Sequence, residues 1–320
     1  MVAFQRKRII IDTDPGVDDA HAMLLAMASP ELQIEAMTSV AGNASVEQTT
    51  NNALAILELL KADHVAVARG MRRPLVQDNH FSTFVHGESG LGGAVLPAPT
   101  RHPEHRHAVD FLIDRITASS GEITLVAIGP LTNLALAIRR EPDLVNAVKE
   151  VIIMGGAIKE PGNVTPQAEF NIHCDPHAAH IVFHSGMPIT LVPLDVTSRV
   201  AMTRQDVDRI SAIPSPIARF FTESSISYLE FYKKYEGMDS CLIHDPLALA
   251  IAFAPDLVQT RDLLVDVDIS GGVSMGRTFA DFSPRRSPHP NMKVALEVDA
   301  KRFLDIFLGR IENLCQKNPF

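Results

Sequence analysis

Short runs of β-branched residues alternate with longer helical patterns along this chain. The run ITLVAIG, at residues 123–129, is apolar throughout, as expected for a strand that is covered on both faces. Strands that alternate with helices favour βαβ units, in which neighbouring strands run parallel. The pattern therefore predicts an α/β fold with a mainly parallel central sheet flanked by helices.

The predicted elements cover most of the 320 residues. We expect strands at residues 8–12, 35–41, 65–69, 123–129, 150–155, 189–195, 263–269 and 293–298. We expect helices at residues 17–28, 46–61, 108–119, 131–139, 176–185, 204–212, 217–235, 246–252 and 300–316. Segments 69–107 and 270–291 are typical of long loops, but elements continue on both sides of each. We therefore expect a single domain over residues 1–320.

Charge and cysteine usage narrow the class of protein. The formal net charge of −9 weighs against nucleic-acid binding, because a phosphate backbone attracts a basic surface. The apolar run at residues 9–11 is too short for a signal-peptide core, and no later stretch reaches the roughly 18 apolar residues of a membrane helix. Cys174, Cys241 and Cys315 form neither a zinc pattern nor a disulfide framework. We expect a cytoplasmic protein without nucleic-acid or membrane partners.

The segment IIIDTDPGVDDAHAML, at residues 10–25, crowds aspartates where the first strand meets the first helix. Asp14, Asp18 and Asp19 would repel one another there unless a cation lay between them. The Pro-Gly turn between them would fold Asp14 back toward the other two. Carboxylate oxygens without a nearby cysteine favour Ca²⁺ or Mg²⁺ over Zn²⁺. The cluster therefore predicts a metal site.

Two other interpretations of this segment stay open. Asp18 and Asp19 are also well placed to cap the helix, although capping accounts for neither Asp12 nor Asp14. Alternatively, the DTD triplet resembles the start of a haloacid-dehalogenase-type phosphatase, a Mg²⁺-dependent phosphohydrolase that would use Asp12 and Asp14. That class requires a hydroxyl residue shortly afterwards, whereas Pro-Gly-Val follows here. We expect Asp12 to be structural.

The nine residues DTDPGVDDA closely resemble the amino-terminal signature of the inosine–uridine-preferring nucleoside hydrolases. Six further motifs of that family follow in the same order. They are VAGN at 40–43, HGESGL at 86–91, IGPLTN at 128–133, MGG at 154–156, the run from Gly162 to Asn171, and IHDP at 243–246. The resemblance therefore covers residues 8–299.

This resemblance implies a nucleoside hydrolase fold with a Rossmann-like core and an enzyme that splits ribonucleosides into ribose and base. It implies a tightly bound Ca²⁺ whose ligands are Asp14, Asp19, Asp245 and the backbone carbonyl of Ile128. It also implies nucleoside salvage as the role and a homodimer or homotetramer as the assembly. A non-catalytic alternative is a Ca²⁺-dependent ribose-binding protein that shows no turnover.

The resemblance also implies how the residues divide the chemistry. Asp14 would take a proton from the attacking water as the general base. Asp18, which the metal does not need, would accept a hydrogen bond from the ribose 2′-hydroxyl. Because buried groups that fit ribose would be left unpaired, a 2′-deoxy substrate should be rejected. The other expected substrate contacts are Asn43, Met154, Asn163, Glu169, Phe170, Asn171 and Asp245, with Glu169 and Asn163 at the 5′-hydroxyl.

The leaving base needs a proton donor, and His244 is the first candidate because histidine can donate near neutral pH. Tyr228 and Tyr232 lie one helical turn apart and would approach the base, although inward packing explains them equally well. His86 would form a wall of the base pocket. The chain has no tryptophan, which favours a broad or pyrimidine-tolerant pocket, and loops 70–85 and 220–243 should set its preference.

Two further features receive structural interpretations. His173, His177, His180 and His184 recur at helical spacing, but a helix packed beside the sheet explains them better than a zinc site. Asn133 should cap or brace the helix that follows the fourth strand.

Overall fold

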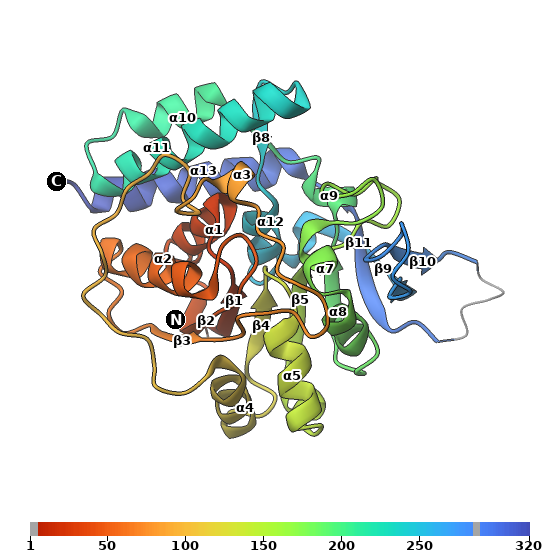
Figure 1. Cartoon of the computed structure of the whole chain (residues 1–320). Helices are drawn as coiled ribbons and strands as arrows, with labels where there is room; N and C mark the ends of the chain where they lie inside the picture. The colour runs from red at the N-terminus through yellow and green to blue at the C-terminus, as the bar shows by residue number, and fades with distance from the viewer. Residues whose placement is uncertain (1–5, 284–288) are drawn as a thin grey trace.

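A twisted sheet forms the centre of the molecule in this computed structural model, which describes residues 6–283 and 289–320 (Figure 1). Within those residues, nine strands pair in the order β10-β9-β11-β6-β5-β4-β1-β2-β3. The strands from β3 to β11 run parallel, whereas β9 and β10 are antiparallel additions at one edge. Their bounds are β1 Lys7–Thr13, β2 Leu32–Ser39, β3 Ala66–Arg69, β4 Thr124–Ala127, β5 Glu150–Met154, β6 Ile189–Val192, β9 Val258–Val267, β10 Thr278–Asp281 and β11 Met292–Val298.

Helices cover both faces of the sheet (Figure 1). Alternate residues of β1 point to opposite sides, so that Ile9 and Ile11 enter one core and Ile10 the other. The first core is built with α1 Val17–Met27, α2 Val46–Leu59, α10 Arg204–Ser211, α11 Pro216–Phe231, α12 His244–Ile251 and α13 Ala300–Lys317. The second is built with α4 Ala108–Ala118, α5 Thr132–Arg140, α6 Leu144–Ala147 and α8 Pro176–Phe183. This layering confirms the predicted α/β fold.

The predicted strands and helices are all present, with ends that shift by a few residues. Several short elements were not predicted: α3 Thr83–His86, α7 Phe170–Cys174, α9 Leu194–Thr197, the 3₁₀ turn Pro255–Leu257, and a ribbon of β7 Ala201–Thr203 with β8 Ser240–Leu242. The expected helix 217–235 ends as an α-helix at Phe231 and continues as a π-helical turn, Tyr232–Glu236. The loop predicted at 270–291 was wrong in part, because it contains β10; residues 284–288 of it lie outside the described residues.

The strand order places a topological switch point beside β1. The chain moves outward from β1 to β2 and β3, then returns to the other side of β1 with β4, β5 and β6. Ligands of open parallel sheets bind outside the carboxyl ends of the strands at such a point. The Asp14 turn follows β1 and Ile128 follows β4, so both lie at this position.

Within the described residues, no helix has both the length and the hydropathy to cross a membrane. All three cysteines are buried, and none of them is disulfide-bonded in that part of the chain.

Candidate active site

The turn between β1 and α1 is held by the carboxylate of Asp19. Its Oδ1 accepts from the Thr13 hydroxyl and from the Asp14 amide at 3.2 Å, and its Oδ2 accepts from the Gly16 amide at 3.0 Å. Asp19 therefore fills the capping role that the sequence left open for it. The same bonds fix the turn that points Asp14 into the site.

Asp14 is fully buried and only partly satisfied. Its Oδ2 accepts from the backbone amide of Asn43 at 2.6 Å, whereas its Oδ1 has no hydrogen-bond partner among the described residues. The backbone comes so close that a Cβ on Gly42 would lie 2.1 Å from Asp14 Oδ2 and one on Gly129 2.5 Å from Oδ1. Glycine is therefore required at both positions.

Four buried aspartates converge here, Asp14, Asp18, Asp19 and Asp245, with 5% exposure at most. Oxygens of Asp18, Asp19 and Asp245 lie within 4.8 Å of one another. Burial, and then the charge of Asp19, raises the pKa of Asp18 to about 7. Burial and the charges of the other carboxylates also raise the pKa of Asp14 and of Asp245 well above the usual range. Such a group needs protons or a cation to be stable, so the residues fit a metal.

Asp12 takes no part in this cluster, as expected. It is buried in β1, where its Oδ1 accepts from the Thr38 hydroxyl and, at 2.8 Å, from Asn133 Nδ2. Asn133 also donates to the Ser39 carbonyl at 3.0 Å and accepts from the Met71 amide at 2.9 Å. Asn133 therefore braces β1 and β2 instead of capping the helix. These contacts leave Asp12 poorly placed to react as a phosphatase nucleophile would.

Asn171, on α7, joins two strand ends at the site. Its Nδ2 donates to the Ile128 carbonyl at 3.1 Å and to the Met154 carbonyl at 3.3 Å. The Met154 sulfur lies 3.5 Å from the same nitrogen. Ile128, Met154 and Asn171, three of the predicted site residues, are thus brought together by short polar contacts.

Glu169 is the amino-terminal cap of α7. It accepts from the amides of Asn171 at 2.9 Å and Ile172 at 3.1 Å, and from the Gly156 amide at 2.9 Å. Nearby, Asn163 is exposed and its Oδ1 accepts from the Phe170 amide at 2.9 Å. The predicted 5′-hydroxyl residues therefore hold a loop-to-helix junction, with Glu169 buried and Asn163 open to solvent.

His244 lies at the start of α12, between two hydroxyl groups. Its Nδ1 is 2.8 Å from Thr197 Oγ1, and its Nε2 is 3.2 Å from the Tyr232 hydroxyl. Burial lowers the pKa of His244 to about 4, so the imidazole is neutral near pH 7. A hydroxyl–imidazole–hydroxyl chain thus runs from α9 through α12 to the end of α11.

Tyr228 and His86 stack beside this chain. Their ring centroids are 5.6 Å apart, and Tyr228 meets Tyr232 edge-on at 5.1 Å. His86 Nδ1 accepts from the Val17 amide at 3.1 Å, which ties the ring to the first turn of α1. Tyr228 and Tyr232 are both buried, whereas Tyr235, three residues beyond Tyr232, is 55% exposed.

Two contributors were not predicted. Thr197 is the first, since its hydroxyl pairs with His244. Ser82 is the second: it donates to Asn43 Oδ1 at 2.6 Å, and Asn43 Nδ2 in turn donates to Asp19 at 2.9 Å. Thr197 lies soon after the carboxyl end of β6, and this position is the one feature of the sequence from which its place at the site could have been predicted.

Comparisons with known proteins identify the family and agree with the fold. The family profile described as inosine-uridine preferring nucleoside hydrolase matches residues 9–305. The pyrimidine-specific ribonucleoside hydrolase RihA of Enterobacter sp. is 40% identical over 304 residues, which cover 95% of this chain and 97% of that protein. Among solved structures, the purine-preferring ribonucleoside hydrolase from Gardnerella vaginalis superposes with a TM-score of 0.93 at 35% identity, covering 97% of this chain and 100% of that one. A plant nucleoside hydrolase, the PpNRh1 enzyme, gives a TM-score of 0.92 at 35% identity, with coverages of 96% and 99%.

Fold, site and relatives together define an N-glycosyl hydrolase that acts on ribonucleosides. Within that class, the chain belongs to the inosine–uridine-preferring nucleoside hydrolase family. The family is metal-dependent, and the aspartate cluster provides the matching acidic site.

Proposed function

We propose that this protein is a Ca²⁺-dependent nucleoside hydrolase that releases ribose and free base from a broad, pyrimidine-tolerant range of ribonucleosides. The observation that carries the proposal is Asp14 Oδ1, which is buried without a hydrogen-bond partner in the described part of the chain, amid other carboxylates. Asp14, Asp19, Asp245 and the Ile128 carbonyl would hold the ion. An all-oxygen set of this kind suits Ca²⁺.

The chemistry that Ca²⁺ supplies when bound is positive charge, which lowers the pKa of the carboxylates and keeps Asp14 ionised near neutral pH. Asp14 then accepts a proton from the attacking water as the general base. Breaking the N-glycosidic bond leaves positive charge on the ribose ring. The remaining negative charge of the cluster stabilises that cation.

The ribose hydroxyls would be read by groups that the fold already holds in place. Asp18 accepts from the 2′-hydroxyl. Because an oxygen of Asp18 lies within 4.8 Å of oxygens of Asp19 and Asp245, this hydroxyl would lie beside the ion. Asn43, bonded to Asp14 and Asp19, and Asn171, bonded to the Ile128 carbonyl, would offer amides to the hydroxyls, and Met154 would pack against the ring. Glu169 and Asn163 bind the 5′-hydroxyl beside Phe170. Two hydrogen bonds support this: Glu169 accepts from the Gly156 amide and so closes the loop between them, and Asn163, in the middle of that loop, accepts from the Phe170 amide at its end.

The leaving base would receive its proton through His244 and Tyr232. Because the resting imidazole is neutral, His244 donates only as a proton arrives from a neighbour, and the hydroxyls of Thr197 and Tyr232 are within hydrogen-bonding distance for that purpose. His86 and Tyr228 form the wall against which the base stacks. The His86 and Tyr228 rings stack on each other with centroids 5.6 Å apart, which supports a wall of aromatic rings at this side of the site.

The breadth of base preference rests on composition and on the relatives. The chain has no tryptophan with which to sandwich a purine. Relatives of similar identity include a pyrimidine-specific and a purine-preferring enzyme, so no single preference follows from likeness. We further propose that the protein is a homo-oligomer, that it acts in nucleoside salvage and that it is cytoplasmic. Its three free cysteines suit the reducing cytoplasm.

The test is reducing-sugar release from inosine, uridine, cytidine and adenosine, before and after prolonged dialysis against a strong chelator. Release that stops on stripping and returns with Ca²⁺ supports both the reaction and the metal, and the order of rates gives the specificity. Binding of ribose with no turnover would instead identify a binding protein. Activity that survives complete stripping would refute the metal assignment.

A further inference from the structure

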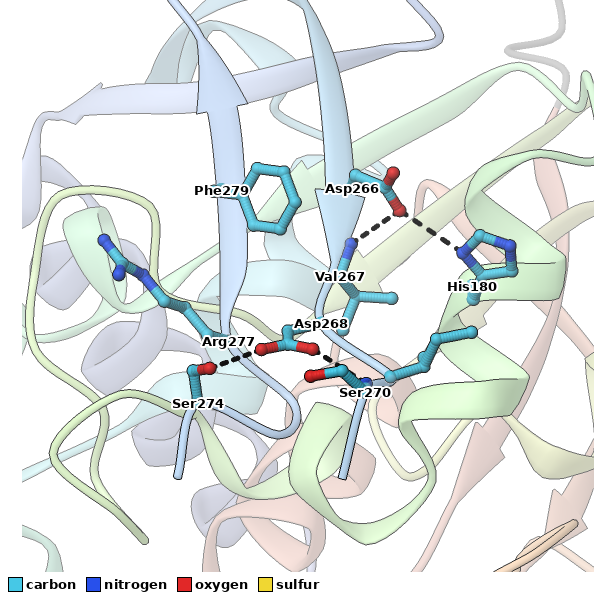
Figure 2. Close-up of a pocket in the computed structure, with 9 residues that line it drawn as sticks. His180, Asp266, Val267, Asp268, Ser270, Ser274, Arg277 and Phe279 are labelled. Atoms are coloured by element: carbon cyan, nitrogen blue, oxygen red, sulfur yellow. Dashed lines mark hydrogen bonds and ion pairs between the residues drawn. The ribbon is translucent and has the colours of Figure 1, made fainter. Parts of the chain in front are cut away.

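A second group of metal-ligating side chains lies at the far edge of the sheet, between α8 and β9. His180 of α8 and His184, which follows the last residue of that helix, both face Asp266 of β9. His180 Nδ1 lies 3.2 Å and His184 Nε2 3.0 Å from the same oxygen, Asp266 Oδ1. Figure 2 shows His180 and Asp266 pointing toward each other across the gap between their elements.

The group is accessible, in contrast to the aspartate cluster. The side chains of His180, His184 and Asp266 are 38%, 39% and 38% exposed. His180 and Asp266 line an open cleft of about 640 Å³, together with Asp268, Ser270, Ser274 and Arg277 (Figure 2). An ion from solvent can therefore reach all three side chains without any movement of the core.

We propose that His180, His184 and Asp266 form a second metal site, for Zn²⁺ or a similar late first-row divalent ion. The three ligand atoms lie within 4.8 Å of one another. Tetrahedral ligands at the usual zinc distances stand roughly 3.3 Å apart. The observed separations of 3.2 and 3.0 Å from Asp266 Oδ1 are close to that value, so binding requires only small shifts.

The donor set selects a different ion from the one expected at the aspartates. Two imidazole nitrogens and one carboxylate oxygen suit zinc, whereas an all-oxygen site suits Ca²⁺. Histidines at i and i+4 on one helix face are a recurring zinc-binding arrangement. Three protein ligands leave a fourth position, and the cleft has room for a water there.

The structure confirms the helix that the histidine spacing predicted and adds a ligand that the spacing could not show. We expected a helix packed beside the sheet here, and α8 is such a helix: it carries His177 and His180, and His184 caps its end. His177 is outside the three-residue group, and the decisive third ligand, Asp266, is 86 residues beyond His180. An ion bound there would tie α8 to the antiparallel edge strands β9 and β10.

The experiment is titration of the full chain with ZnCl₂ by isothermal calorimetry, in excess Ca²⁺ so that zinc does not enter the aspartate cluster. The wild type should bind one equivalent. His184→Ala and Asp266→Asn should each weaken that binding by roughly tenfold or more. His177→Ala is the matched control, since it removes a histidine from the same helix, and its affinity should be unchanged.

Two results would overturn the proposal: no zinc uptake by the wild type up to millimolar concentration, or equal uptake by the wild type and both ligand variants. Circular dichroism of each variant guards against misfolding. Substitution with Co²⁺ provides a second readout, because a four-coordinate site gives much stronger visible bands than the six-coordinate, all-oxygen surroundings of free Co²⁺. Absence of those bands in wild-type protein that binds Co²⁺ would also refute the site.

Discussion

The aspartate cluster and the His180–His184–Asp266 group differ in what surrounds their carboxylates. Asp18 is buried among other acids, and its pKa is raised to about 7. Asp266 is partly exposed; burial is the largest single effect and raises its pKa, but the hydrogen bonds from His184, the Val267 amide and His180 together lower it overall. Ionising a carboxylate therefore costs free energy in the aspartate cluster unless a cation is bound, whereas Asp266 ionises at little cost.

This difference predicts which site depends on its ion. The buried carboxylates repel one another at neutral pH, so a cation contributes directly to the integrity of the active site. The exposed group is satisfied by its own hydrogen bonds, so an ion adds to a structure that is already stable. Catalysis should therefore depend on the first site and tolerate changes in the second.

The largest expected effect is from Asp14→Ala, which removes both a metal ligand and the general base. Turnover should fall by about 10⁴-fold, the upper end for general-base catalysis. Steady-state release of ribose from inosine and uridine measures it. Wild-type turnover in Asp14→Ala would mean that catalysis does not depend on the aspartate cluster. The two metal-ligating regions would then not differ in function, because Asp14 carries the buried, unpartnered oxygen that assigns the ion to the first region.

A smaller loss is expected from His244→Ala, about 10²-fold in kcat. If His244 serves the leaving base, inosine and uridine should be affected unequally, because their bases differ in the need for protonation. Thr197→Val is the companion variant, since it removes only the hydroxyl 2.8 Å from His244 Nδ1. Equal losses for all substrates in both variants would assign His244 a purely positional role.

The stabilisation by Ca²⁺ should depend on pH. The folded pKa values of the four aspartates lie above the unfolded value of about 3.9, so the metal-free fold is favoured by protonation and loses that contribution as pH rises. Calcium requires the ionised form and opposes the loss. The free energy by which Ca²⁺ stabilises the fold should therefore grow from about pH 4 to about pH 7, where it reaches about 2.7 kcal/mol at 100 times Kd. The difference in Tm between Ca²⁺-saturated and metal-free protein should grow with it.

Buried histidines also make stability depend on pH in this range, because they ionise near pH 6.5 in the unfolded chain but not in the fold. The difference between the two metal states is therefore the proper quantity. Burial lowers the pKa of His21 and His86 to about 3, and they affect both states alike. A difference in Tm that does not change between pH 4 and pH 7 would mean that the aspartates are not the Ca²⁺ ligands.

Much of the fold was predictable because local patterns determine it. Buried parallel strands are apolar, and the β1–α1 turn is encoded by adjacent residues, so Asp14, Asp18 and Asp19 were identified together. Contacts between segments far apart in the chain leave no local pattern in the sequence and were not predicted. Thr197 meets His244 from 47 residues away, and Asp266 meets His180 from 86 residues away. The roles of Asp245 and Ile128 came only from the family resemblance.

The smallest expected effect is from Asp266→Asn in the absence of zinc. The lost pairing with two partly exposed histidines should cost less than about 1 kcal/mol, as for other exposed ion pairs. Because the folded pKa of Asp266 is depressed, its contribution is present above the unfolded value of about 3.9 and is lost as pH falls through the folded value. Urea unfolding should therefore show a small difference between wild type and variant at pH 6 that shrinks as the pH falls below the unfolded value of about 3.9. A loss of several kcal/mol would place Asp266 in the same category as the buried aspartates, and the contrast between the two regions would fail.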